Sequence, residues 1–303
     1  MQHTPTHPEG ASPLVSVIVP VYNDAERLKL CLEALAAQDY PCYEVIVADN
    51  GSTDREVERV CEAFGVTFVT ETKVGSYAAR NTGVSLAKGE LLAFTDADCI
   101  PEPQWLARGV KRFVKTPNCG LVGGRIRVFA QDPERPTTVE LYEVALAFPQ
   151  RTYVENSRYG ATANVFTSRA VFEEVGPFNE RLRSGGDREW GQRVAAAGYT
   201  LVYAHEACVR HPARRTFAEL YKKSHRTVGG LRDTDARWST AAMLLKEYLK
   251  PPVKLSLQVL RDEQHGFSLQ QKVRVCGVAL ASRLMNAAET VKLWAGRTPS
   301  SRA

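Results

Sequence analysis

Short apolar segments alternate with amphipathic helical patterns over the first hundred residues, and this alternation most limits what the chain can fold into. β-Branched runs at 14–20, 43–48 and 66–70 are each followed by a helical pattern, and a fourth run at 91–95 ends the series. Strands separated by helices form a largely parallel sheet that binds ligands beyond the carboxyl ends of its strands. The sequence therefore predicts an α/β protein with a Rossmann-like, mostly parallel sheet flanked by helices.

Two acidic residues, Asp96 and Asp98, directly follow the fourth apolar run. Side chains in an extended segment repeat every two residues, so both carboxylates leave the strand on the same side. Such a pair can hold Mg²⁺ or Mn²⁺ and leave coordination positions for the phosphates of a ligand. The alternative is a pair of turn-forming aspartates at the end of a strand.

The second half of the chain continues with mixed elements. We expect helices at 105–114, 139–147 and 189–197, a helix from Ser168, a segment at 159–167, a strand pair at 120–124 and 125–129, and a strand at 199–204. The predicted organisation is a flexible lead-in at 1–13, a main domain at 14–230 and a basic helical tail at 231–303. Within the main domain, 14–100 is the predicted nucleotide-binding half and 101–230 the acceptor half.

Composition favours a globular protein of a reducing compartment. The 303 residues are 44% hydrophobic and 24% charged. The seven cysteines form no Cys-x-x-Cys pair and match no disulfide framework or zinc site. Residues 1–13 lack the pattern of a secretory signal, and no apolar run approaches the roughly 18 residues needed to span a bilayer. The predicted location is cytoplasmic.

Positive charge gathers at the C-terminal end. Residues 1–203 contain 21 Lys or Arg and 26 Asp or Glu, whereas residues 204–303 contain 18 and 8. The tail carries apolar and small residues at helical spacing, namely Gly277, Leu280, Leu284, Ala287, Val291 and Trp294. Two readings stay open for this helix. It packs on the main domain, or it docks on an anionic membrane surface at the inner face of the membrane.

An ordered set of motifs resembles the family 2 glycosyltransferases, enzymes of the GT-A fold, over roughly residues 14–226. The motifs are Val17-Ile18-Val19-Pro20-Val21-Tyr22-Asn23, Val45 to Asp54, Ala79-Arg80-Asn81-Thr82-Gly83, Phe94-Thr95-Asp96-Ala97-Asp98, Gly186 to Trp190 with Arg193, and His211. The resemblance implies an inverting, metal-dependent transfer of a sugar from a nucleoside diphosphate sugar to an acceptor hydroxyl. The implied cofactor is Mn²⁺ or Mg²⁺.

The resemblance also implies roles for individual residues. Tyr22 would pack against the nucleotide base, Asp49 would accept a hydrogen bond from it, and Asp96 would face the ribose. Asp98 would hold the metal, with His211 as a further ligand. The residues expected to contact the donor are Pro20, Tyr22, Asp49, Arg80, Asp96, Ala97 and Asp98. Asp49 can also be a turn residue that bonds its own backbone, and His211 an exposed loop histidine. Asn50 departs from the acidic doublet common at this place in the family.

Asp187 is the predicted general base. The family places a carboxylate here that takes the proton from the acceptor hydroxyl. As an alternative or additional role, Asp187 can cap the helix that follows it. Gly186 replaces the first acid of the usual doublet, so Glu189 is the reserve candidate for the base. The basic stretch 210–226 is expected either to close over the diphosphate or a phosphorylated acceptor, or to be a solvated helix face.

The leading hypothesis is a glycosyltransferase that uses a UDP-sugar and a saccharide or lipid-linked acceptor, in polysaccharide or glycolipid biosynthesis. A nucleotidyltransferase on a related α/β scaffold is the first alternative, but Pro20-Val21-Tyr22-Asn23 is not a Gly-rich phosphate loop. The second alternative is a nucleic-acid-binding module that uses the basic tail. The tail lacks interleaved aromatic residues on a recognisable motif, so no nucleic-acid partner is predicted.

Overall fold

The computed structural model describes residues 12–234, 238–261 and 265–295, which divide into two compact units. The sheet unit consists of the chain up to Arg127, Phe148–Arg181 and Gly186–His211. The helical unit consists of Val128–Ala147, Leu182–Gly185 and the chain from Pro212 onward.

One eight-stranded sheet has the order β3-β2-β1-β4-β7-β6-β8-β5. Its strands are β1 (Val15–Val21), β2 (Tyr43–Asp49), β3 (Thr67–Thr70), β4 (Leu91–Thr95), β5 (Ile100–Pro101), β6 (Cys119–Phe129), β7 (Asn164–Ser168) and β8 (Thr200–Pro212). The pairs among β3, β2, β1 and β4 are parallel, whereas β7 runs antiparallel to β4 and β6. The carboxyl ends of β1, β2 and β4 therefore lie at one edge of the sheet.

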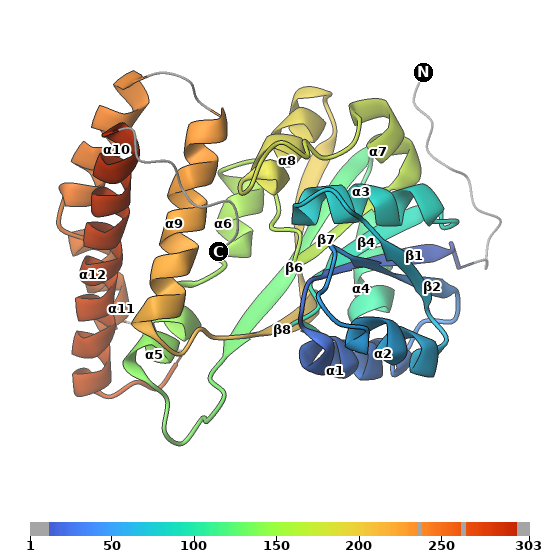
Figure 1. Ribbon diagram of the computed structural model, residues 1–303, viewed down its shortest axis with the longest axis horizontal. Helices are drawn as coiled ribbons and strands as arrows, with labels where there is room; N and C mark the ends of the chain where they lie inside the picture. The colour runs from blue at the N-terminus through green and yellow to red at the C-terminus, as the bar shows by residue number, and fades with distance from the viewer. Residues whose placement is uncertain (1–11, 235–237, 262–264, 296–303) are drawn as a thin grey trace. The chain divides into compact units, whose positions relative to one another are not determined.

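Helices flank this sheet. They are α1 (Ala25–Ala36), α2 (Glu56–Phe64), α3 (Ser76–Leu86), α4 (Trp105–Lys115), α6 (Gln150–Glu155), α7 (Arg169–Val175) and α8 (Gly186–Ala196). In Figure 1, α1 and α2 lie on one face of the sheet and α3 on the other. The described part of the chain thus has the predicted mixed α/β fold.

The two faces of β1 explain this layering. Val15, Val17 and Val19 are fully buried in one core cluster with apolar residues of α1 and α2. Ile18 points to the opposite face, where α3 approaches so closely that a β-carbon on Gly83 would lie 2.7 Å from Cγ2 of Ile18. Because both faces of β1 are covered, its sequence is an apolar run broken only by Ser16 rather than an alternating pattern.

Several predicted elements differ in extent from those observed. The expected strand pair at 120–124 and 125–129 is wrong, because β6 is a single strand that passes through Gly123 and Gly124. These glycines provide room rather than a turn: a β-carbon on Gly124 would lie 2.4 Å from the carbonyl oxygen of Ala207. The strand expected to end at Ala204 continues to Pro212 and carries His211. Helix α8 begins at Gly186 rather than at Glu189.

The helical unit contains α5 (Thr138–Leu146), α9 (Phe217–Thr234), α10 (Trp238–Leu249), α11 (Val253–Arg261) and α12 (Leu269–Trp294). Val139 of α5, Leu220 of α9 and Val278 of α12 form one small core cluster. Leu141, Val259 and Val275 form a second cluster that joins α11 to the same helices. Thr137 and Glu140 close a capping box at the start of α5. Among the described residues, no helix is long and apolar enough to cross a membrane.

A buried carboxylate joins α9 to α12. Glu289 is 1% exposed and accepts hydrogen bonds from Tyr221 and from Lys292, the latter at 2.7 Å. Nδ1 of His225 lies 2.6 Å from its other oxygen. Burial by itself raises the pKa of Glu289, but the bonds from Lys292, Tyr221 and His225 outweigh burial and lower it to about 2. The charged form of Glu289 is therefore the one that stabilises this unit.

We predict that this carboxylate sets part of the acid stability of the helical unit. A depressed pKa stabilises the fold above the ordinary value of 4.5, and this contribution is lost as the pH falls toward 2. In urea unfolding followed by circular dichroism, the stability advantage of the wild type over Glu289→Gln should shrink by about 2 to 3 kcal/mol across this range. Glu134→Gln, which changes an exposed loop carboxylate, is the control. Identical pH dependence in Glu289→Gln and the wild type would contradict the prediction.

Candidate active site

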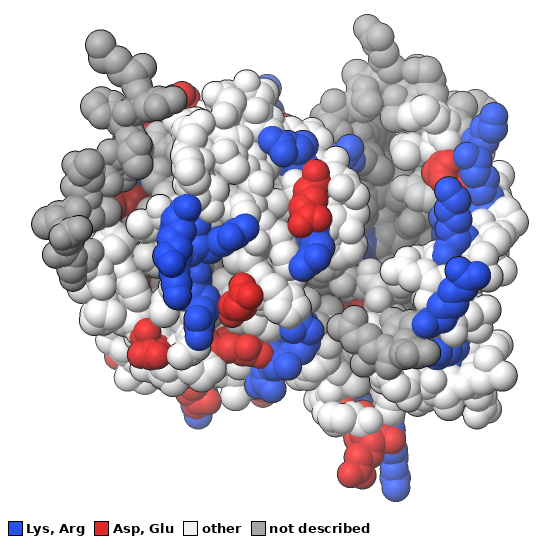
Figure 2. All heavy atoms as spheres, turned by 180° about the vertical axis from the view of Figure 1, so that it is seen from behind, with Lys and Arg blue, Asp and Glu red and all other residues white. Residues whose placement is uncertain are grey.

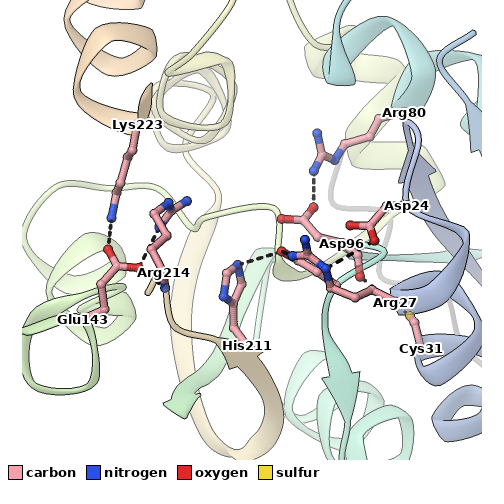
Figure 3. Close-up of polar contacts among 10 residues, drawn as sticks. Asp24, Arg27, Cys31, Arg80, Asp96, Glu143, His211, Arg214 and Lys223 are labelled. Atoms are coloured by element: carbon pink, nitrogen blue, oxygen red, sulfur yellow. Dashed lines mark hydrogen bonds and ion pairs between the residues drawn. The ribbon is translucent and has the colours of Figure 1, made fainter. Parts of the chain in front are cut away.

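Helix α3 brings a buried arginine to the acidic segment that follows β4. Arg80 is 4% exposed and donates from Nη2 to Oδ1 of Asp96, and from Nη1 to the carbonyl oxygen of Ser76 at 3.2 Å. Its guanidinium also lies over the ring of Tyr77, with Cζ 5.7 Å from the ring centroid. A buried guanidinium requires an opposite charge, so Arg80 fixes the position of Asp96. Figure 3 shows this pair.

Asp98 lies between an arginine and a histidine. Its Oδ2 is 3.6 Å from Nε2 of His211 and 3.6 Å from Nη1 of Arg27. His211 is 6% exposed and its ring packs against Phe148, with centroids 4.7 Å apart. Arg27 of α1 also lies 3.2 Å from Asp24 (Figure 3). Residues separated by more than a hundred positions thus meet at one carboxylate.

The residues around Asp98 fit a divalent cation. The ligand atoms of Asp98, Cys99 and His211 all lie within 4.8 Å of one another. A carboxylate and an imidazole are donors that Mn²⁺ accepts. Burial raises the pKa of the Cys99 thiol well above its usual value, so this cysteine stays protonated. Asp98 and His211 are consequently the pair best suited to hold a metal, and His211 is a buried strand residue rather than an exposed loop histidine.

Asp49 ends β2 and makes local hydrogen bonds. It is 5% exposed and accepts from the backbone N–H of Ser52 at 3.0 Å and from the Ser52 hydroxyl. These bonds are those of a turn aspartate, the alternative considered from the sequence. Pro20 and Ala97 are buried, whereas Tyr22 is 44% exposed at the end of β1, whose Val21 pairs with Asp49. The aromatic side chain and the carboxylate therefore stand at the same edge of the sheet.

The hydrogen bonds of Asn50 explain why an asparagine stands where the family commonly has the second acid of a doublet. Its side-chain Nδ2 donates to the carbonyl oxygens of Glu71 and Lys73, at 3.3 and 2.8 Å. Its Oδ1 accepts from the backbone N–H of Gly75 at 2.7 Å. A carboxylate can replace the acceptor but not the donors. Asn50 is thus a brace for the loop that leads into α3.

Asp187 lies in the first turn of α8, in contact with α3. The hydroxyl of Tyr77 lies 3.3 Å from its Oδ1, and the N–H of Arg188 donates to the same oxygen at 2.8 Å. Burial raises the pKa of Asp187 above its ordinary value, against the lowering effect of the Arg188 bond and the Arg80 charge. A carboxylate with a raised pKa is a stronger base. Glu189, the reserve candidate, instead pairs with Arg193 at 2.7 Å.

The basic stretch after His211 is held by buried carboxylates of α5. Arg214 and Lys223 both contact Glu143, each at 2.8 Å, and Glu143 is 1% exposed (Figure 3). Burial alone raises the pKa of Glu143, but Lys223 and Arg214 together lower it. Arg215 lies 3.6 Å from the fully buried Glu140. These arginines and this lysine have structural partners inside the helical unit, which the sequence did not suggest.

The structure brings together most of the predicted site. Arg80 and Asp96 form one pair, Asp98 and His211 another, and Asp187 contacts the helix that carries Arg80. Sequence reasoning missed Tyr77 and Arg27. Tyr77 stands three positions before Arg80, on the same helix face, and this spacing is the signal that could have found it.

Comparison with known proteins assigns the family. The model described as "Glycosyl transferase family 2" matches residues 16–176, more than half of the chain. The chain belongs to the family 2 glycosyltransferases. A curated relative, glycosyltransferase AglE of Haloferax volcanii, is 39% identical over 289 residues, which cover 90% of this chain and 93% of that protein. The predicted family and enzyme class are confirmed.

Solved structures support the fold of this glycosyltransferase. A mannosyltransferase from Pyrobaculum calidifontis, determined in complex with GDP-Man and Mn²⁺, is 22% identical with a TM-score of 0.58, over 96% of this chain and 77% of that one. TarS residues 1–349 of S. aureus are 16% identical with a TM-score of 0.53, over 94% and 92%. The predicted GT-A fold with a C-terminal helical region is therefore confirmed.

We predict that Asn50→Asp destabilises this glycosyltransferase by about 1 to 3 kcal/mol, because a carboxylate loses two donated hydrogen bonds and faces two carbonyl oxygens. Urea unfolding measures the change. Asp54→Asn, an exposed substitution in the same loop, is the control and should be close to neutral. Equal stability of Asn50→Asp and the wild type would show that the brace contributes nothing.

Proposed function

We propose that this glycosyltransferase transfers a sugar, with inversion at the anomeric carbon, from a nucleoside diphosphate sugar to an acceptor hydroxyl. The acceptor we infer is a saccharide or a lipid-linked saccharide in polysaccharide or glycolipid biosynthesis. Mn²⁺ or Mg²⁺ is the proposed cofactor. Residues 14–100 supply the donor contacts in this proposal, residues 101–230 the acceptor side, and residues 231–303 a basic helical tail.

The proposal rests on one observation, the meeting of Asp98 and His211. A buried imidazole nitrogen 3.6 Å from a carboxylate oxygen, beyond the end of a parallel strand, is a donor set suited to Mn²⁺. When bound there, the metal supplies Lewis-acid stabilisation of the diphosphate that departs. Arg27 adds positive charge beside the same carboxylate. Negative charge that develops on the leaving group thus has a stabilising partner in this chain.

Asp187 is the proposed general base. Its carboxylate takes the proton of the acceptor hydroxyl while that oxygen attacks the anomeric carbon from the face opposite the diphosphate. A single displacement of this kind inverts the configuration. The elevated pKa of Asp187 favours this role, because burial makes the carboxylate more basic.

The residues proposed to contact the donor lie at the carboxyl edge of the parallel strands. Tyr22 offers an exposed aromatic face for the base, and Asp49 a carboxylate that can accept a base N–H in place of its bonds from Ser52. Asp96 is proposed to face the ribose, with Arg80 holding it in place. Uracil carries an imide N–H that suits Asp49, so a UDP-sugar is the proposed donor. The mannosyltransferase neighbour was determined with GDP-Man, which makes GDP-sugars the comparison to include.

The test is release of nucleoside diphosphate from a panel of UDP- and GDP-sugars, with and without Mn²⁺. We expect release to require the metal. Asp98→Ala should weaken nucleotide binding in the presence of Mn²⁺, because a metal ligand is lost. Asp187→Asn should leave nucleotide binding largely intact and lower kcat by about 10²- to 10⁴-fold, because the base is lost.

Glu189→Gln is the matched control for the base, since it removes a carboxylate two positions away in the same helix turn. Full transfer activity in Asp187→Asn would remove this residue as the base. Turnover by the wild type that is unaffected by chelation of divalent metals would refute the proposed metal dependence.

A further inference from the structure

Helix α12 carries a straight stripe of exposed aliphatic side chains along its length. Leu269, Val273, Leu280, Leu284 and Val291 are 72, 58, 46, 51 and 42% exposed. At about 100° per residue these five positions fall within an arc of about 60°. Twenty-two residue steps of about 1.5 Å give the stripe a length of about 33 Å. The other helices of the helical unit therefore leave this face of α12 uncovered.

The neighbouring helix repeats the pattern. Val253, Leu257 and Leu260 of α11 are 58, 45 and 41% exposed and share one face at spacing i, i+4, i+7. Lys272 of α12 donates to the carbonyl oxygen of Leu260 at 3.0 Å, so the two helices lie against each other. Two adjacent helices therefore present aliphatic side chains to the outside.

Basic residues flank the stripe. On α12, Lys272 lies to one side of it and Arg274 and Lys292 to the other, each about 90° to 110° from its centre. Arg283 does not contribute to this flank, because its guanidinium donates to the carbonyl oxygens of Glu247 and Tyr248 in α10. Residues 243–295 contain eight Lys or Arg and four Asp or Glu. In Figure 2, Lys and Arg side chains follow one another along the edge where the C-terminal helices lie.

We propose that the exposed faces of α11 and α12 dock on the surface of an anionic lipid bilayer. The aliphatic stripe would enter the boundary between headgroups and acyl chains, and the flanking Lys and Arg would contact anionic headgroups. The positive charge of this surface favours an anionic bilayer over a second copy of the chain as its partner. A second copy would bring the same excess of positive charge to the interface. The stripe includes Leu280, Leu284 and Val291 of the predicted tail pattern, whereas Ala287 is buried and the Trp294 side chain lies outside the described residues.

Flotation of the full chain with lipid vesicles tests this docking surface, independently of transfer activity. We expect the protein to float with vesicles that contain phosphatidylglycerol, less with phosphatidylcholine alone, and less at high salt. The double variant Leu280→Gln/Leu284→Gln should reduce the bound fraction about ten-fold. Leu30→Gln/Leu86→Gln is the matched control, because these leucines of the sheet unit are 49 and 44% exposed.

Three results would overturn the docking surface. The first is equal flotation of the stripe variant and its matched control, and the second is no flotation of the wild type with anionic vesicles. The third is a concentration-dependent dimer in sedimentation that the stripe variant abolishes, which would make a second copy the occupant.

A separate observation concerns Tyr77, which the proposed mechanism does not use. Tyr77 is 6% exposed, and its hydroxyl reaches Oδ1 of Asp187 because position 186 has no side chain: a β-carbon on Gly186 would lie 2.6 Å from Cε2 of Tyr77. Burial raises the pKa of Tyr77, so its hydroxyl stays a proton donor. The ring thus occupies the space that the first acid of the family doublet would need.

We infer that Tyr77 is a positioning residue for Asp187, an inference that rests on the proposed role of Asp187 as the base. The hydroxyl holds the carboxylate in its charged form and fixes its orientation. The other charged or titratable groups that act on this carboxylate are Arg80, Asp96 and Tyr159, besides the backbone N–H of Arg188. Loss of the Tyr77 bond should therefore make Asp187 easier to protonate.

The pH profile of kcat for Tyr77→Phe tests this role. We expect its acidic limb to move to higher pH and kcat at neutral pH to fall by about ten-fold, with KM for the donor unchanged. Tyr199→Phe is the control, because Tyr199 donates to Glu174 elsewhere in the sheet unit. If the acidic limb of Tyr77→Phe stays at the pH of the wild type and Asp187→Asn is inactive, the positioning role of Tyr77 alone is refuted. An active Asp187→Asn would instead refute the base on which it rests.

Discussion

The buried ion pair between Arg80 and Asp96 ties helix α3 to the end of β4, and the rest of the site depends on it. A guanidinium that is 4% exposed is tolerable only beside an opposite charge, so the pair cannot be broken without a large cost. The same helix contacts Asp187 through Tyr77 and holds the loop before α8 through Asn81, which donates to the carbonyl oxygen of Phe178 at 2.9 Å. One helix thus positions acidic residues from two distant parts of the chain.

Asp98 lies close to a second carboxylate, to an arginine and to a histidine. It is separated from Asp96 by one residue and is flanked by Arg27 and His211, each 3.6 Å away. Two carboxylates this close in sequence repel each other unless positive groups compensate. Arg80 compensates Asp96, and Arg27 compensates Asp98. These partners hold the two carboxylates in fixed positions, and a divalent cation would bind to carboxylates that are already in place.

The local structure around the site could be predicted from the sequence, whereas the long-range contacts could not. The alternation of strands and helices and the place of Asp96 and Asp98 follow from periodicity, and β4 has the bounds predicted for it. The strand pair expected at 120–124 and 125–129 is one strand, and only tertiary packing reveals that Gly124 faces the backbone of Ala207. The contact of Tyr77 with Asp187 spans 110 residues and has no sequence period to predict it.

The most direct test of the central claim is the position of a bound cation. Crystals of the full chain grown with Mn²⁺ and UDP would give an anomalous difference map at the manganese absorption edge. We predict a peak within coordination distance of a carboxylate oxygen of Asp98 and of Nε2 of His211, with the diphosphate against the metal. A peak at Asp187 or Glu189, or a diphosphate bound away from Asp98, would contradict it.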